Sequence, residues 1–123
     1  MKSELLSYSP GDGWSVSEGS NLDSEATLVV AFASPTQCEN LEAIRWLKAQ
    51  YPRSVVIGCS TSGEFLGNEL RDDSISALVV RFDSTVLRKA SVEIAEPSQT
   101  QEAAGRLAQM LAGDDLAGVF ILS

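Results

Sequence analysis

Apolar runs bounded by turn-forming residues predict two strands and an intervening helix between residues 27 and 58. Residues 27–33 form an almost continuous apolar run, which is typical of a strand covered on both faces. Residues 39–50 predict a helix that Pro52 ends, and residues 54–58 predict a second apolar strand. Such a βαβ unit places the two strands parallel, with a right-handed crossover. The buried face of the helix is expected to carry Leu41, Ile44, Leu47 and Tyr51.

The remainder of the chain predicts further strands and one more helix. Residues 74–82 and 85–95 are two apolar runs separated only by Asp83 and Ser84, which favours an antiparallel hairpin. A helix follows, with Ser98 and Gln101 spaced as a capping box, and residues 117–122 form a last apolar strand. The predicted fold class is therefore α/β, a mixed sheet with a parallel βαβ unit and an antiparallel hairpin, with helices packed on the sheet.

The first 26 residues have the weakest pattern. They are rich in serine, glycine and acidic residues, and we expect a flexible or loosely packed arm, with a short strand plus a helix as the alternative. Residues 27–123 are expected to form one domain. Because an apolar strand comes last, we expect this domain to be truncated at its C-terminus, and an edge position of that strand would favour a homodimer.

Composition excludes several classes of function. The net charge of −8 and the scattered basic residues argue against nucleic acid or an anionic membrane as a partner. The absence of histidine excludes Ser-His-Asp and Cys-His catalysis and histidine-ligated zinc or haem. No apolar run approaches the roughly 20 residues that span a bilayer, and no signal peptide is recognisable. Cys38 and Cys59 lack Cys-x-x-Cys spacing, so reduced thiols and a cytoplasmic location are expected.

The stretch from Gly58 to Gly67 is the candidate site, because ligands gather where parallel strands of α/β sheets end. Its glycine spacing resembles a phosphate-binding loop, but Glu64 stands where the lysine is required. It also resembles a nucleophile elbow, but Ser62 replaces the second glycine and no histidine is present. We therefore expect no enzyme activity and no cofactor.

What remains is a set of small hydroxyls, backbone amides and one carboxylate, which suits a small zwitterion. The amides and hydroxyls would bind its carboxylate, and Glu64 its ammonium group. The alternative is that the hydroxyls only satisfy turn amides while Glu64 faces solvent. The expected ligand-binding residues are Ser34, Gly58, Cys59, Ser60, Thr61, Ser62, Gly63 and Glu64.

Three segments resemble the N-terminal half of FIST domains: residues 30–35 (VAFASP), 56–65 (VIGCSTSGEF) and 74–80 (SISALVV). The resemblance implies a bacterial or archaeal intracellular sensory module that binds small ligands, such as amino acids. It also implies a C-terminal FIST half or a signalling output domain as partner. Three alternatives stay open: a haem-based nitric oxide sensor, an enzyme with Cys59 as nucleophile, and a ligand-free protein-interaction module.

Two positional predictions follow from this topology. Cys38 and Cys59 should lie at the same end of the sheet, because one follows the first strand and the other ends the second. Trp46 should be exposed as a contact for a partner, because it lies opposite the expected buried helix face at about 100° per residue.

Overall fold

A computed structural model describes residues 1–15, 21–66 and 68–122. The chain forms two compact units, of which one is Arg88–Ile121 and the other is the rest of the described chain. Among the described residues, no helix has the length and apolar character needed to span a membrane.

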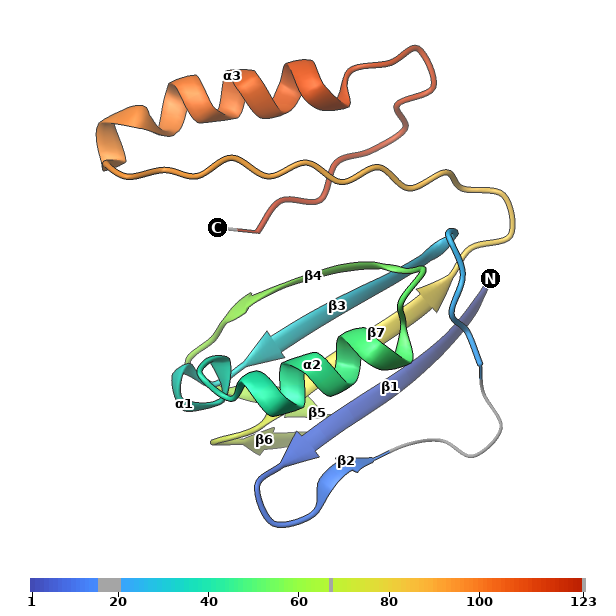
Figure 1. Cartoon of the computed structure of the whole chain (residues 1–123), viewed down its shortest axis with the longest axis vertical. Helices are drawn as coiled ribbons and strands as arrows, with labels where there is room; N and C mark the ends of the chain where they lie inside the picture. The colour runs from blue at the N-terminus through green and yellow to red at the C-terminus, as the bar shows by residue number, and fades with distance from the viewer. Residues whose placement is uncertain (16–20, 67, 123) are drawn as a thin grey trace. The chain divides into compact units, whose positions relative to one another are not determined.

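The first unit contains a five-stranded mixed sheet with the order β2-β1-β7-β3-β4 (Figure 1). Strands β3 and β4 are parallel, as predicted, whereas β7 lies antiparallel to both β1 and β3. The predicted fold class, a mixed α/β sheet with helices packed against it, is confirmed. The strands are β1 (Lys2–Ser9), β2 (Gly13–Ser15), β3 (Thr27–Ala33), β4 (Val55–Ser60) and β7 (Ile75–Arg81).

Strand β1 corrects the expectation of a loose N-terminal arm. Lys2–Ser9 lies between β2 and β7 and pairs with β7 from Lys2 to Tyr8. Leu6 is fully buried in the main core, while its neighbour Leu5 is exposed. Residues 16–20 of the expected arm lie outside the described residues. The arm prediction was wrong for β1 because its burial depends on pairing with a distant strand, which local composition does not reveal.

The crossover between β3 and β4 consists of two helices, α1 (Pro35–Cys38) and α2 (Leu41–Gln50). The helix predicted at residues 39–50 is α2, and α1 is additional. Ser34 caps α1, because its side chain accepts a hydrogen bond from the Gln37 amide, and Asn40 caps α2 through the Ala43 amide. Two consecutive caps therefore divide the crossover into two helices.

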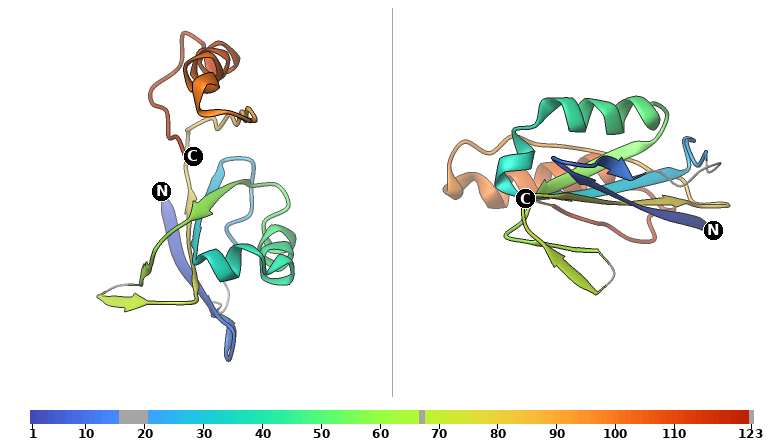
Figure 2. Two further views of the ribbon diagram at one scale, coloured as in Figure 1. Left: turned by 90° about the vertical axis from the view of Figure 1, so that its left-hand side faces the viewer. Right: turned by 90° about the horizontal axis from the view of Figure 1, so that it is seen from below.

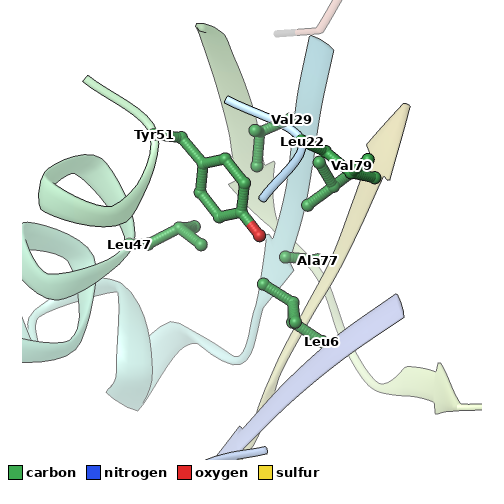
Figure 3. Close-up of a cluster of buried hydrophobic side chains, with 7 residues drawn as sticks. All are labelled: Leu6, Leu22, Val29, Leu47, Tyr51, Ala77 and Val79. Carbon is green, nitrogen blue, oxygen red and sulfur yellow. The ribbon is translucent and has the colours of Figure 1, made fainter. Parts of the chain in front are cut away.

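One face of the sheet is covered by α2, and its core is shown in Figure 3. The predicted helix face is correct for Leu47 and Tyr51, which are buried, and Ile44 is half-buried, but Leu41 is 57% exposed and Ala43 is buried instead. The predicted exposure of Trp46 is also wrong. Its ring is half-buried and stacks on Trp14, with 5.2 Å between the ring centroids. The buried face of α2 is rotated from the predicted one because Trp46 packs on Trp14. The Trp14 indole nitrogen also donates to the Ala43 carbonyl at 3.2 Å.

A two-stranded hairpin of β5 (Glu64–Leu66) and β6 (Glu69–Arg71) lies on the face opposite α2 (Figure 2). The hairpin predicted at residues 74–95 is not formed. Strand β7 pairs with β1 and β3 instead, and residues 85–95 carry no strand. Antiparallel hairpins therefore exist, but they are β1–β2 and β5–β6.

The second unit is built around α3 (Thr100–Leu111), preceded by the short 3₁₀ helix η1 (Pro97–Gln99). The helix prediction is confirmed, although the capping box consists of Glu96 and Gln99. Arg88 and Asp115 form an ion pair at 2.7 Å, and the guanidinium hydrogen bond lowers the pKa of the Asp115 carboxyl. Residues 117–122 form no strand, so the prediction of a last strand is wrong for the described structure.

The hydrogen bond between Tyr51 and Glu4 predicts a loss of stability at alkaline pH. The Tyr51 hydroxyl donates to Glu4 Oε1 at 2.6 Å, and burial, followed by this bond and by the charges of Glu4 and Asp23, raises the Tyr51 pKa. The unfolded chain ionises tyrosine near pH 10. Because the folded pKa is raised, the contribution is complete below pH 10 and is lost as pH rises above it.

We expect Tyr51→Phe to reduce the fall in unfolding free energy between about pH 9 and 11 relative to the original chain. Urea unfolding followed by tryptophan fluorescence at several pH values measures this difference. Glu4→Gln should reduce the fall only in part, because burial, the larger cause, remains. Identical pH slopes for the original chain and Tyr51→Phe would contradict this assignment.

Candidate functional site

The carboxyl ends of β3 and β4 lie side by side, which is where the sequence places the candidate site. Ala33, the last residue of β3, is paired with Ser60, the last residue of β4. The Thr61 amide donates to the Ala33 carbonyl at 2.9 Å, and the Thr61 hydroxyl lies 3.5 Å from the same oxygen. The parallel pairing thus brings Ser34, Ser60 and Thr61 together at the carboxyl ends of β3 and β4, as predicted. This end of the sheet is called the candidate edge below.

Ser34 is buried, and its hydrogen bonds connect several segments at this end of the sheet. Its Oγ accepts a hydrogen bond from the Gln37 amide at 3.3 Å, and its own amide donates to the Ser74 carbonyl at 3.0 Å. Ser34 therefore connects the end of β3 with the start of α1 and with the residue before β7. A serine hydroxyl that accepts one bond still has a proton to donate. That proton is the group that Ser34 could offer to a ligand.

Gly58 and Cys59 lie within β4, before the loop. A Cβ atom added at Gly58 would lie only 2.4 Å from the carbonyl oxygen of Ala31, so glycine is required for the close approach of β4 to β3. Cys59 is half-buried and pairs with Phe32 on the sheet face away from α2. The structure therefore gives Gly58 a packing role that the sequence alone did not reveal.

The remaining predicted residues follow Thr61 along the chain. Ser62 is exposed and Gly63 is half-buried, so both belong to the loop that leads from β4 to the hairpin. Glu64 is the first residue of β5, but its side chain lies outside the described part of the structure, as does Gly67. The predicted set thus divides into residues at the edge, residues inside β4 and residues of the following loop.

A chain of polar side chains beside this edge was missed by the sequence analysis. Gln37 Nε2 donates to Asp73 Oδ1 at 2.9 Å, and Asn40 Nδ2 donates to both Gln37 Oε1 at 2.9 Å and Tyr8 Oη at 3.0 Å. Asp73 has a φ of 57°, a left-handed conformation that aspartate tolerates better than most residues. Only Asn40 carried a sequence signal, because asparagine before an apolar helical pattern is a common N-cap.

The two cysteines lie at the same end of the sheet, as predicted. Cys38 Sγ lies 3.8 Å from the Ala33 carbonyl oxygen, and Cys59 is one pair before the end of β3 and β4. They lie on different faces, however. Cys38 packs against the small core cluster of Ala33, Ala43 and Ile75, whereas Cys59 lies beside Phe32 on the face away from α2. Both thiols are free.

Comparison with known protein families matches residues 27–123 to the FIST N domain. The match covers most of the chain, including the strands that form the candidate edge. The chain belongs to the FIST family. FIST domains are sensory domains of signal transduction, so the resemblance of the three sequence segments is confirmed at the level of the family. Neither the curated proteins nor the solved structures contain a match to this chain.

The close approach at Gly58 predicts a loss of stability when a methyl group is added. We expect Gly58→Ala to lower the unfolding free energy by about 1–3 kcal/mol, because the added carbon meets backbone rather than a movable side chain. Gly11→Ala is the matched control, since an added Cβ there has no neighbour within 4 Å. Urea unfolding of both variants tests this. Equal stability of Gly58→Ala and Gly11→Ala would contradict the packing role.

Proposed function

We propose that this FIST domain is a cytoplasmic sensory domain that binds a small zwitterionic metabolite, such as an amino acid, where β3 and β4 end. The proposal rests on one observation, the anchoring of Ser34, Ser60 and Thr61 around the end of β3. Binding rather than catalysis is proposed, because the chain contains no histidine to activate a serine or cysteine.

A zwitterion is proposed because the residues that follow the ends of β3 and β4 include several hydroxyls and one carboxylate, Glu64. Ser60 is exposed and ends β4, so its hydroxyl is available to a ligand carboxylate. Ser62 would add a further hydroxyl, and Glu64 would supply the charge that an ammonium group requires. Ser34 would contribute its remaining proton from the opposite strand.

A ligand bound here would act on several elements at once. Ser34 is bonded to α1 and to Ser74, the residue before β7. The bonds among Asp73, Gln37, Asn40 and Tyr8 extend from this edge to α2 and β1. The signal would then be read by a C-terminal FIST half or by an output domain, as the family resemblance implies.

A thermal-shift screen of the chain with the common amino acids, followed by calorimetric titration, tests the proposal. We expect Glu64→Gln to weaken binding of an identified amino acid by about tenfold or more, because a hydrogen bond to a charged group contributes about 1.5–3 kcal/mol. Ser60→Ala should also weaken binding.

The matched control is Ser3→Ala, since Ser3 is an exposed strand serine near the start of β1. It should leave both affinity and melting temperature unchanged. Unchanged affinity in Glu64→Gln and Ser60→Ala would show that the ligand binds elsewhere.

A further inference from the structure

Strand β7 carries a buried hydroxyl that makes no hydrogen bond. The Oγ atom of Ser76 is buried and has no partner among the described residues, and the residue as a whole is only 7% exposed. A buried hydroxyl without a partner costs free energy, so nearly all such groups in folded proteins are bonded. The exception at Ser76 therefore needs an explanation, and a polar group that binds to it is one.

Ser76 belongs to the sheet face away from α2. Its neighbours Ile75 and Ala77 pack in the core clusters on the α2 side, and successive side chains of a strand point to opposite faces. The β5–β6 hairpin lies on the face of Ser76, and β5 lies beside β7 (Figure 2). The hairpin is therefore the described element that can cover Ser76.

The pairing register places further polar residues beside Ser76. Ser7 of β1 lies directly opposite Ser76, and Ser15 of β2 lies opposite Ser7. On the other side, Phe32 of β3 lies opposite Ser76, and Cys59 of β4 lies opposite Phe32. We call these five residues the serine row. The row runs across the five strands of the sheet and contains no charged side chain.

On this face the covered pair is polar and the exposed pair is apolar. Ser7 is 8% exposed, like Ser76 opposite it, whereas Leu5 and Leu78, the next pair on the same face, are 46% and 43% exposed. The hydrophobic effect alone would favour covering the two leucines rather than the two serines. Burial of the hydroxyls instead favours a role in binding a polar group.

The serine row fits an uncharged polar group. Each serine hydroxyl has one proton to donate and two lone pairs that accept. Ser7 shares one hydrogen bond with the Ser15 hydroxyl at 3.0 Å, and Ser76 makes none in the described structure. A hydroxyl or a carboxamide both donates and accepts, so it could bond to both serines. A buried charge would be costly, because the row holds no opposite charge.

The serine row lies next to the candidate edge. Phe32 and Cys59 are the pair immediately before Ala33 and Ser60, the last pair of β3 and β4. A ligand held at the candidate edge could therefore extend its side chain across Phe32 toward Ser76.

We propose that Ser76 and Ser7 bind the side chain of the ligand beneath the β5–β6 hairpin, and that this ligand is an amino acid whose side chain ends in a hydroxyl or a carboxamide. The inference rests on the proposed function and specifies the ligand class of the same site. The ligand supplies the hydrogen bond that Ser76 lacks in the free chain. Because the Ser76 Oγ is buried, the ligand reaches it only if the hairpin shifts during binding.

Urea unfolding of the free chain tests whether the Ser76 hydroxyl is unbonded. We expect Ser76→Ala to lower the unfolding equilibrium constant by about fivefold, because it removes a buried group without a partner. Ser7→Ala is the matched control, since Ser7 is equally buried in the same row but is bonded to Ser15. It should raise the constant. A loss of stability in Ser76→Ala as large as that in Ser7→Ala would overturn the inference.

Calorimetric titration with L-asparagine and L-leucine tests the ligand class. The two side chains have a similar branched shape, but only that of asparagine ends in hydrogen-bonding atoms. We expect the original chain to bind L-asparagine about tenfold more tightly or better, because a site with buried polar groups rejects an analogue that cannot bond to them. Ser76→Ala should weaken binding of L-asparagine by about tenfold and leave that of L-leucine unchanged.

Glu64→Gln separates this inference from the proposed function. It should weaken both amino acids, because both carry the ammonium group. Equal affinity of the original chain for L-asparagine and L-leucine would overturn the inference and leave the proposed function intact, as would unchanged L-asparagine affinity in Ser76→Ala. Binding of neither amino acid would also overturn the inference, and the proposed function would then depend on the wider amino-acid screen.

Discussion

Helix α2 is held on the sheet by Leu47 and Tyr51, which pack with Val29, Ala77 and Val79 in one buried cluster. The arrangement of the candidate edge depends on this contact, because it fixes the crossover that sets β4 beside β3. The Tyr51 hydroxyl adds a bond to Glu4 and so ties the end of the same helix to β1. Apolar packing at the C-terminal end of α2 thus fixes the position of β4. It thereby also positions the polar groups that follow the carboxyl ends of β3 and β4.

The elements that the sequence predicted well are those whose burial is visible locally. Strand β3 and helix α2 show a continuous apolar run and a helical period, and neither needs a distant partner to be recognised. Strand β7 was recognised as a strand but given the wrong neighbour, because side-chain alternation does not identify the pairing partner. Residues 85–95 and 117–122 have apolar patterns without a described strand, since a strand also requires a partner with free backbone groups.

The candidate site was predictable to the extent that it follows from parallel pairing. Ser34 and Thr61 meet because β3 and β4 end together, and that conclusion required only the βαβ pattern. The bonds from Asp73 to Tyr8 join separate segments, so only the folded register could reveal them. Gly58 could not be interpreted from sequence, because a missing Cβ admits either a ligand or a neighbouring strand, and here the carbonyl of Ala31 occupies that space.

Strand β4 has different requirements along its inner side and at its end. Its inner side needs glycine for the approach to β3, and its last residue, Ser60, leads into the candidate loop. A ligand that orders Ser60 and Thr61 against Ala33 would favour the extended conformation that pairing with β3 also requires. Because such coupling is reciprocal, ligand binding and the pairing of β4 with β3 would stabilise each other.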